Sequence, residues 1–317
     1  MASGGVKDKV LAWLRIVRLQ FYPMTWVAYS LGAVAASSSS QKCDLQVYGV
    51  GYLALFFVEL STILTNEYYD YDTDRLNKNA GPFTGGTRML VEGKLGFHEV
   101  KIGILVALLL VVGSGSMLMR IAPDVSPFSI FLLLLIGVSL GLGYTAPPFK
   151  FSYRGLGELT VGLTHSPYVI LCGYIFQGGS WQNPLPWLLC LPLFFATLGA
   201  ITLAGIPDRL ADQEVSKKVL AVIFGPRGAV ILSSLFVGIA AFSGMLLWYF
   251  RIIKGIRGGM ILFVIPHGLI LLFVLFKLIQ SRNYDRKIDG IMTLSLSYII
   301  WFGIIPLLAF LPGLKCQ

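Results

Sequence analysis

The chain has 317 residues, of which 56% are hydrophobic and 13% are charged, and its mean hydropathy is +0.75. Soluble domains carry about 25% charged residues, so this composition excludes an ordinary water-soluble fold and predicts an all-α integral membrane protein. A formal net charge of +9 would favour nucleic acid as the partner of a soluble protein. Beside so much apolar sequence it indicates basic residues facing an anionic leaflet, and we expect the lipid bilayer and no nucleic acid as a partner.

Apolar runs long enough to cross a bilayer recur along the chain. Residues 1–20 are basic and amphipathic and lack the apolar core of a cleavable signal, so we expect them to lie at the membrane interface. The four cysteines show no CxxC spacing, which argues against a zinc site. We predict a single membrane domain over 1–317 with nine transmembrane helices, at residues 21–36, 47–65, 101–119, 128–145, 158–177, 185–204, 228–250, 259–279 and 290–311.

Basic residues are unevenly divided between the two sides of these predicted helices. With the N-terminus in the cytoplasm, most of the 25 Lys and Arg fall in the N-terminal segment and the even-numbered connections. This asymmetry follows the positive-inside rule, so we expect a multi-pass protein with its N-terminus and its active-site loops on the cytoplasmic side. The segment RIIKGIRGG at 251–259 is the exception, because it puts three basic residues outside.

Two short acidic segments follow or end apolar runs on the predicted cytoplasmic side. TNEYYDYDTDR holds Asp70 and Asp74 four residues apart, and PDRLAD holds Asp208 and Asp212 with the same spacing. Residues four apart share one face of a helix, where two carboxylates repel each other unless a cation lies between them. Carboxylates suit Mg²⁺, which fills its remaining positions with water and phosphate oxygens. The pair of segments therefore predicts Mg²⁺ ions around a bound diphosphate.

The first segment extends the predicted metal site by two residues. Asn66 has the same four-residue spacing from Asp70, so it belongs to the same polar stripe, and Glu67 lies beside it. The expected metal ligands are Asn66, Glu67, Asp70, Asp74, Asp208 and Asp212.

Other polar residues have a less specific signal. Asp72 and Glu214 are expected to face water. Glu59 lies about two turns inside the second predicted helix, where a charge is costly. Either a functional role or a protonated side chain hydrogen-bonded between helices would explain it. His165 and His267 lie in separate predicted helices without a partner pattern, and we expect both to be packed polar residues.

The two acidic segments resemble the signatures of the UbiA superfamily of intramembrane prenyltransferases, NDxxDxxxD and DxxxDxxxGK. Here they stand as NEYYDYDTD at 66–74 and DRLADQEVSK at 208–217. The resemblance implies a UbiA-like bundle with a central cavity and active-site motifs and loops at 66–100 and 205–227. Two departures are Glu67, where the usual residue is aspartate, and Ser216, where glycine usually precedes Lys217. At Ser216 the backbone is less free than it would be at glycine.

The resemblance also implies an activity, the Mg²⁺-dependent transfer of an isoprenyl group from a prenyl diphosphate to a small aromatic acceptor through an allylic carbocation. The segment AGPFTGGTRMLVEGKLG at 80–96 is most similar to the branch that prenylates 1,4-dihydroxy-2-naphthoate in menaquinone biosynthesis. The residues implied in catalysis are Asp70, Asp74, Asp208, Asp212 and Tyr144. The residues implied in contact with the diphosphate are Arg75, Arg88, Lys94, Lys150, Arg154 and Lys217. Tyr68 and Tyr69 would face the prenyl cation, or belong to an interfacial aromatic belt.

Other functions share these motifs. A terpene cyclase, or prenyl transfer to a non-aromatic acceptor such as a glycerol phosphate, would need the same acids and Mg²⁺. A cation-coupled transporter is a third reading, but transporters place such acids near the bilayer midplane, whereas these lie at helix ends. The sequence leaves open the acceptor, the length of the prenyl chain and the oligomeric state.

Overall fold

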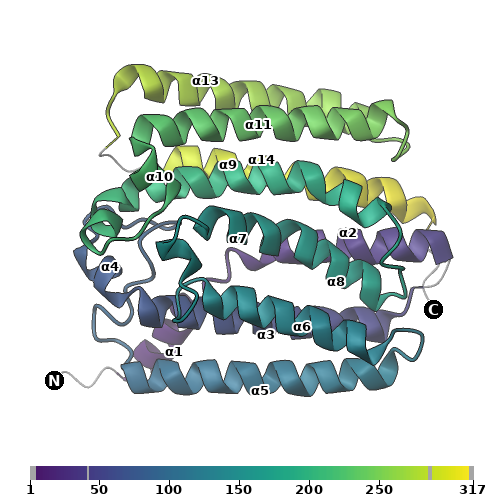
Figure 1. Cartoon of the computed structure of the whole chain (residues 1–317), viewed down its shortest axis with the longest axis horizontal. Coiled ribbons are helices and arrows are strands. Elements are labelled where there is room, and N and C mark those ends of the chain that lie inside the picture. Colours follow the sequence, from purple (N-terminus) through teal and green to yellow (C-terminus); the bar gives the residue numbers. More distant parts are fainter. Residues whose placement is uncertain (1–4, 41–42, 285–287, 314–317) are drawn as a thin grey trace.

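The structure is a computed structural model that describes residues 5–40, 43–284 and 288–313. The first four residues of the predicted interfacial segment therefore lie outside the described residues. Within those ranges the regular elements are all helices, stacked side by side along one long direction (Figure 1).

The longer helices run along the bundle. In chain order they are α2 (Tyr22–Ser40), α3 (Leu45–Tyr69), α5 (Phe97–Ile121), α6 (Pro127–Gly143), α7 (Gly157–Leu163) with α8 (Val169–Phe176), α9 (Leu185–Glu214), α11 (Gly225–Tyr249), α12 (Arg257–Gly259) with α13 (Ile265–Ser281), and α14 (Asp289–Phe310). Five-residue π-helical turns join α7 to α8 (Thr164–Tyr168) and α12 to α13 (Met260–Val264). The short helices are α1 (Val6–Ile16), α4 (Tyr71–Leu76) and α10 (Leu220–Ile223), with 3₁₀ turns at Phe151–Tyr153 and Leu311–Gly313.

Seven continuous helical runs among the described residues are long and apolar enough to cross a membrane. They are Leu45–Tyr69, Phe97–Ile121, Gly157–Phe176, Leu185–Glu214, Gly225–Tyr249, Arg257–Ser281 and Asp289–Phe310. Helix α6 is apolar but has only 17 residues, and the 19-residue α2 ends in four serines. The prediction of an all-helical, multi-span membrane fold is confirmed, whereas the count of nine spans stays a prediction.

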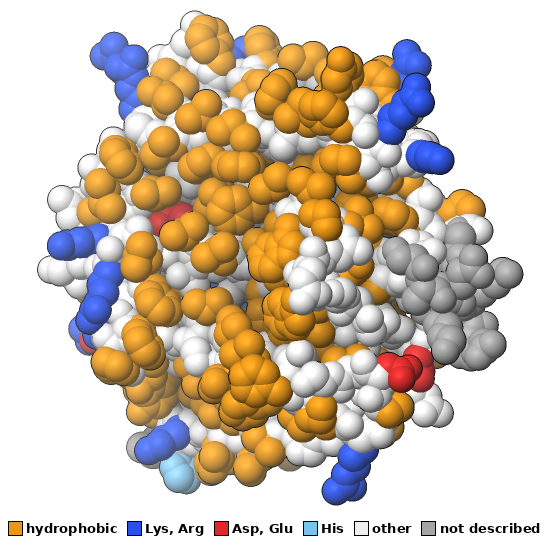
Figure 2. Space-filling view, turned by 45° about the vertical axis from the view of Figure 1, so that its right-hand side comes forward, with side chains coloured by type: hydrophobic (Ala, Val, Ile, Leu, Met, Phe, Trp, Pro, Cys, Tyr) orange, Lys and Arg blue, Asp and Glu red, His pale blue; other side chains and the backbone are white. Residues whose placement is uncertain are grey.

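Apolar side chains cover the outside of the bundle. Leu109 and Val112 on α5 are 62% and 65% exposed, and Phe242 on α11 is 65% exposed. Figure 2 shows hydrophobic side chains over most of one face, with Lys and Arg near its edges. A surface this apolar is stable against lipid and not against water. The outward faces of these helices therefore fit the hydrocarbon region of a bilayer.

The crossing of α2 and α8 depends on two glycines. A Cβ on Gly32 would lie 2.0 Å from the carbonyl oxygen of Ile170, and one on Gly173 would lie 2.1 Å from that of Tyr29. No side chain fits at either position, so the two backbones approach directly. Small residues allow this approach between membrane helices, where dispersion contacts stabilise packing.

The acidic segments meet at one end of this bundle. Helix α4 continues from the end of α3, and α10 follows the end of α9, and both short helices lie at the left of Figure 1. Helix α4 contacts α9 directly. The contact between α4 and α9 thus brings together two motifs that are far apart in the chain.

Candidate active site

The two acidic segments line opposite sides of a polar cavity of about 130 Å³ where α3, α4 and α9 meet. Asn66, Asp70 and Asp74 come from the first segment, and Asp208 and Asp212 come from the second. All five residues of this acidic set were singled out in the sequence, and the structure brings them together at one site.

The first segment keeps its polar stripe through a break in the helix. Asp70 ends α3 and precedes α4, yet its N–H still donates to the carbonyl oxygen of Asn66 at 2.8 Å. The N–H of Asp74 donates to the carbonyl oxygen of Asp70 at 2.8 Å. The four-residue repeat therefore persists, and the three side chains stay on the cavity side. Asp72 is 73% exposed and pairs with Arg75 at 3.6 Å, so the prediction that it faces water is confirmed.

Lys217 joins the two segments. Its Nζ donates to Asp70 Oδ2 at 2.9 Å and lies 3.6 Å from Asp212 Oδ1, and its side chain is only 9% exposed. Burial alone would lower the pKa of Lys217, but the carboxylates of Asp70 and Asp212 hold that pKa well above its usual value. The cavity thus contains a permanent positive charge between its acidic walls.

Asp208 is held by the loop that follows α4. Its Oδ1 accepts a 2.7 Å hydrogen bond from Asn77 Nδ2, and its Oδ2 accepts a 3.1 Å bond from the N–H of Gly85. Gly85 has a φ of +74°, a conformation that glycine adopts without steric cost. This glycine-containing loop therefore fixes the orientation of a carboxylate on the opposite wall.

Asp74 packs directly against the same loop. A Cβ built on Gly86 would lie 1.9 Å from Asp74 Oδ2. Burial, reinforced by the nearby carboxylates of Glu67 and Asp70, raises the pKa of Asp74 to about 8. Burial and the neighbouring carboxylates thus disfavour the charged form of Asp74, and a cation bound beside it would favour that form.

The donor set fits Mg²⁺ bound together with a phosphate group. Five carboxylates and two amide side chains line the cavity, and Asn66 Oδ1 is buried without a hydrogen-bond partner. Among the described residues, no group of three acidic, histidine or cysteine side chains converges closely enough to hold a metal by itself. Mg²⁺ needs no such cage, because it keeps waters and accepts substrate phosphate oxygens as ligands. The oxygen donors therefore suit an ion whose remaining ligands come from a diphosphate.

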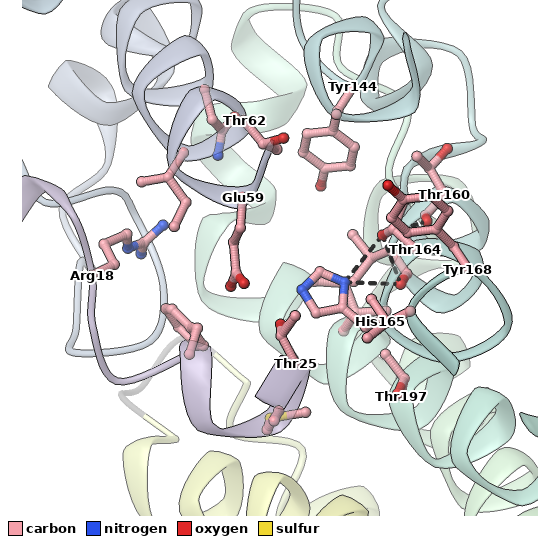
Figure 3. A pocket seen from close by; sticks show the side chains of 18 of the residues that line it. Arg18, Thr25, Glu59, Thr62, Tyr144, Thr160, Thr164, His165, Tyr168 and Thr197 are labelled. Carbon is pink, nitrogen blue, oxygen red and sulfur yellow. Dashed lines mark hydrogen bonds between the residues drawn. The ribbon is translucent and has the colours of Figure 1, made fainter. Parts of the chain in front are cut away.

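A second cavity of about 250 Å³ adjoins the first, deeper in the bundle. Both cavities share Asn66, Tyr144 and Arg18 in their walls. The rest of the wall is mainly apolar, with a few polar side chains, among them Glu59 and His165 (Figure 3). A ligand with a charged head and an uncharged body would fit these two cavities, with its head in the polar one and its body in the mainly apolar one.

Comparison with known proteins decides the family. The signature of the UbiA prenyltransferase family matches residues 24–310. The chain belongs to this family. It is 25% identical over 209 residues to 1,4-dihydroxy-2-naphthoate octaprenyltransferase of Bacillus subtilis, which covers 65% of this chain and 62% of that protein. The chain thus spans less than two thirds of that relative's length.

Two further comparisons bear on this UbiA-family chain. It is 25% identical over 275 residues to digeranylgeranylglyceryl phosphate synthase of Methanobrevibacter smithii, covering 87% of this chain and 89% of that one. Its fold matches a UbiA homologue from Archaeoglobus fulgidus bound to GPP and Mg²⁺, with a TM-score of 0.63, 20% identity, and coverage of 93% of this chain and 99% of that one. The structural match establishes the UbiA fold.

Of the six basic residues that the UbiA resemblance implied, only Lys217 lines the polar cavity. Arg75 pairs with Asp72, and Lys94 pairs with Glu92 at 2.5 Å. Arg154 donates to the carbonyl oxygen of Pro148 at 2.8 Å. These three side chains lie at the surface. Each is long enough to reach a carboxylate or a carbonyl oxygen nearby in the chain.

Arg88 and Lys150 are also engaged outside the cavity. Arg88 Nη1 donates to the carbonyl oxygens of Asp74 and Asn77, at 2.7 and 3.2 Å, and so ties the loop to α4. Lys150 Nζ lies 4.8 Å from the centre of the Tyr153 ring. In this conformation neither residue lines the polar cavity.

The structure separates the three tyrosines that the sequence grouped. Tyr144 lines both cavities. Tyr68 and Tyr69 line neither, because Tyr68 packs edge-on against Phe97 and Tyr69 is 43% exposed. Their positions at the end of α3 turn them away from the face that carries Asn66 and Asp70. A role of Tyr68 and Tyr69 beside the prenyl cation therefore stays a prediction that this conformation does not support, and the alternative of an interfacial aromatic belt remains.

Glu67 also points away from the cavity. Its two carboxylate oxygens accept 2.7 Å hydrogen bonds from the backbone N–H and the hydroxyl of Thr87. It lines neither cavity, so in this conformation it anchors the loop after α4 and is not placed as a metal ligand.

Sequence reasoning missed several residues of the site. Arg18 lines both cavities, and its Nε is buried without a hydrogen-bond partner. Tyr153 donates its hydroxyl to Asp70 Oδ1 at 3.0 Å, and Glu158 Oε1 accepts from the N–H of Leu220 at 2.7 Å. Arg18 precedes the first predicted span, and nothing in the sequence marked it as a site residue beyond its place in the count of basic residues. Asn77 lies three residues after Asp74, so its closeness to the first motif could have suggested it as a site residue.

Proposed function

We propose that this chain transfers an isoprenyl group from a prenyl diphosphate to a small aromatic acceptor, with Mg²⁺ as cofactor. The observation that carries the proposal is the polar cavity, in which two acidic walls face each other with Lys217 between them and an apolar cavity behind. A diphosphate fits the polar part, and an uncharged organic group fits the part behind it.

The proposed ligands of Mg²⁺ are Asn66, Asp70, Asp74, Asp208 and Asp212. When bound, Mg²⁺ supplies positive charge that stabilises the departing diphosphate. Lys217 and Arg18 add fixed positive charge on the two sides of the same cavity, at no cost of reorganisation during the reaction. Glu67, in this proposal, acts through Thr87 by holding the loop that positions Asp74 and Asp208.

The junction of the two cavities is where the prenyl carbon would react. Tyr144 lies at that junction, and an aromatic face stabilises a nearby cation by its quadrupole. The apolar walls beyond it exclude water, which would otherwise capture an allylic cation. The aromatic face at the junction and the apolar walls beyond it both support transfer through a carbocation.

Two relatives of this chain support two different acceptors. Similarity to the Bacillus naphthoate prenyltransferase supports 1,4-dihydroxy-2-naphthoate, and thus a role in quinone biosynthesis. Similarity to the Methanobrevibacter synthase supports a glycerol phosphate acceptor as the alternative. A UbiA-type terpene cyclase would use the same acidic walls without any acceptor.

We further propose that α2 and α6 complete nine spans, with the acidic end of the bundle in the cytoplasm. Both helices lie within the bundle beside the seven longer runs, α2 against α8 and α14, and α6 against α3. The excess of basic residues at that end supports the orientation.

Product analysis tests the activity. Purified protein is incubated with Mg²⁺, prenyl diphosphates of several lengths, and separately 1,4-dihydroxy-2-naphthoate, other phenolic acids, a glycerol phosphate, or no acceptor, and products are identified by mass spectrometry. We expect a prenylated aromatic product and no product after chelation of Mg²⁺. Release of diphosphate and a hydrocarbon without acceptor would instead show a cyclase.

A further inference from the structure

The second cavity contains two polar side chains on facing walls that the diphosphate chemistry does not use. Glu59 comes from α3, and His165 comes from the π-helical turn Thr164–Tyr168 between α7 and α8. Figure 3 shows both side chains directed into the same space. The sequence suggested that His165 would be a packed residue, but it lines the cavity wall.

Glu59 presents an unsatisfied acceptor. Its Oε2 is buried and has no hydrogen-bond partner, while Thr25 lies beside the carboxylate (Figure 3). The Tyr22 hydroxyl, near enough to interact electrostatically with Glu59, is likewise buried without a partner. A buried polar atom left without a partner destabilises a protein. A ligand with a hydrogen-bond donor would remove that cost.

His165 presents a second acceptor. Its Nδ1 lies 3.1 Å from the carbonyl oxygen of Val161 and 3.1 Å from the hydroxyl of Thr164. A carbonyl oxygen only accepts, so the bond to Val161 assigns the proton of the neutral ring to Nδ1. Nε2 is then the free acceptor, and within the described residues it makes no hydrogen bond. Single π-helical turns often mark functional sites, and this one orients the ring.

These acceptors discriminate between the ligands that could occupy the cavity. An alkyl chain offers no donor to Glu59 or His165. A phosphate would be repelled by the carboxylate, and Arg18 is the one Lys or Arg among the described residues lining this cavity. A hydroxylated ring supplies donors at its edge and apolar faces for the walls.

Building on the proposed function, we propose that Glu59 and His165 select the acceptor by accepting hydrogen bonds from its ring hydroxyl groups. A hydroxyl donating to a carboxylate makes a strong, charge-assisted bond. The same bond pushes electron density into the ring, which makes its carbon a better nucleophile. The acceptor class is therefore a planar ring with free hydroxyls, and hydroxyl recognition is separate from diphosphate binding.

The test compares Glu59→Gln with a matched control, Glu214→Gln, at an exposed position of α9. Steady-state constants are measured for a prenyl diphosphate, and for 1,4-dihydroxy-2-naphthoate against its 1,4-dimethoxy counterpart. We expect Glu59→Gln to raise the acceptor KM about 10- to 100-fold, as for loss of one charged hydrogen bond. The KM for the prenyl diphosphate should stay within twofold, and the preference for hydroxyl over methoxyl should shrink. Glu214→Gln should match the wild type throughout.

A second variant keeps the test decisive if Glu59→Gln does not fold in detergent. His165→Asn keeps an amide donor near the carbonyl oxygen of Val161 and loses the acceptor that faces the cavity. It should raise the acceptor KM without changing the KM for the prenyl diphosphate. In His165→Gln, whose amide reaches the position of Nε2, part of the acceptor affinity should return.

The outcomes separate this inference from the proposed function. Wild-type turnover with an unchanged acceptor KM and hydroxyl preference in the folded variants would overturn the role of Glu59 and His165 alone. Efficient use of a glycerol phosphate in place of hydroxylated rings would also overturn it, while leaving prenyl transfer intact. Absence of Mg²⁺-dependent turnover in the wild type, with every donor and acceptor, would overturn the proposed function itself.

Discussion

Lys217 donates a 2.9 Å hydrogen bond to the carboxylate of Asp70, which precedes it by 147 residues in the chain. Because Lys217 also lies 3.6 Å from Asp212, it holds the ends of α3 and α9 at a fixed separation. The bond therefore does two things, since it closes one end of the bundle and keeps two acidic walls from repelling each other.

Replacing Lys217 by Met should affect both stability and diphosphate binding. Removing one partner of a buried ion pair costs about 3–5 kcal/mol in a dry interior, and less here because the cavity admits ions. We expect a lower unfolding temperature without Mg²⁺, partly restored by Mg²⁺ with diphosphate, and at least a tenfold weaker diphosphate Kd. Lys218→Met, at the exposed neighbouring position, is the control. A change confined to the acceptor KM would show that Lys217 does not contact the diphosphate.

The contrast between Asp74 and Asp72 tests the acidic wall within one short helix. Asp74 lines the polar cavity, whereas Asp72 is exposed and pairs with Arg75. Asp74→Asn should lower kcat/KM at least about 100-fold, since it removes a proposed ligand of the Mg²⁺ that stabilises the departing diphosphate. Asp72→Asn should stay within about twofold of the wild type, because exposed ion pairs contribute little. Equal activities of the two variants would contradict the assignment of Asp74.

Gly86 and Gly93 form a second matched pair. Both have positive φ, +65° and +64°, but a Cβ on Gly86 would collide with Asp74 whereas one on Gly93 would meet nothing within 4 Å. Alanine adds about 1–2 kcal/mol of backbone strain at either position. We expect both variants to lose stability, measured by thermal unfolding, and Gly86→Ala to lose at least as much as Gly93→Ala because of the collision. Only Gly86→Ala should also lose most of its Mg²⁺-dependent activity, because it displaces the Asp74 carboxylate; similar activities would refute this contact.

The sequence predicted the parts of the site that repeat at helical spacing. Asn66, Asp70 and Asp74 could be placed on one face because backbone bonds continue through the break at Asp70. The helices themselves could be predicted because apolar runs of spanning length have few other solutions in a bilayer. The pairing of Asp208 with Asn77 and Gly85 could not, since it depends on the path of a loop.

Long side chains were the least predictable part of the site. Arg75, Lys94 and Arg154 stand near the motifs in sequence, but each finds a partner at the surface. Arg18, far from either motif in sequence, reaches both cavities. The position of a Lys or Arg in the chain says little about where the charged end of its side chain lies. The side chain is long and flexible, so several nearby carboxylates and carbonyl oxygens can compete to bind that end. Tertiary packing at the end of the bundle decides between them.

Ser216 occupies the position where the family pattern has glycine, and its φ is +61°. A left-handed conformation costs a non-glycine residue about 1–2 kcal/mol, while glycine loses about 0.5–1 kcal/mol more entropy on folding. Ser216→Gly should therefore raise the free energy of unfolding by about 0.5–1 kcal/mol, seen as a rise of one or two degrees in unfolding temperature. The control Ser297→Gly, inside α14, should lower the free energy of unfolding.

Since Lys217 directly follows Ser216, an altered diphosphate KM in Ser216→Gly would show that the strained turn also positions Lys217. A fall in unfolding temperature would show that the serine hydroxyl stabilises this turn by more than its strain costs.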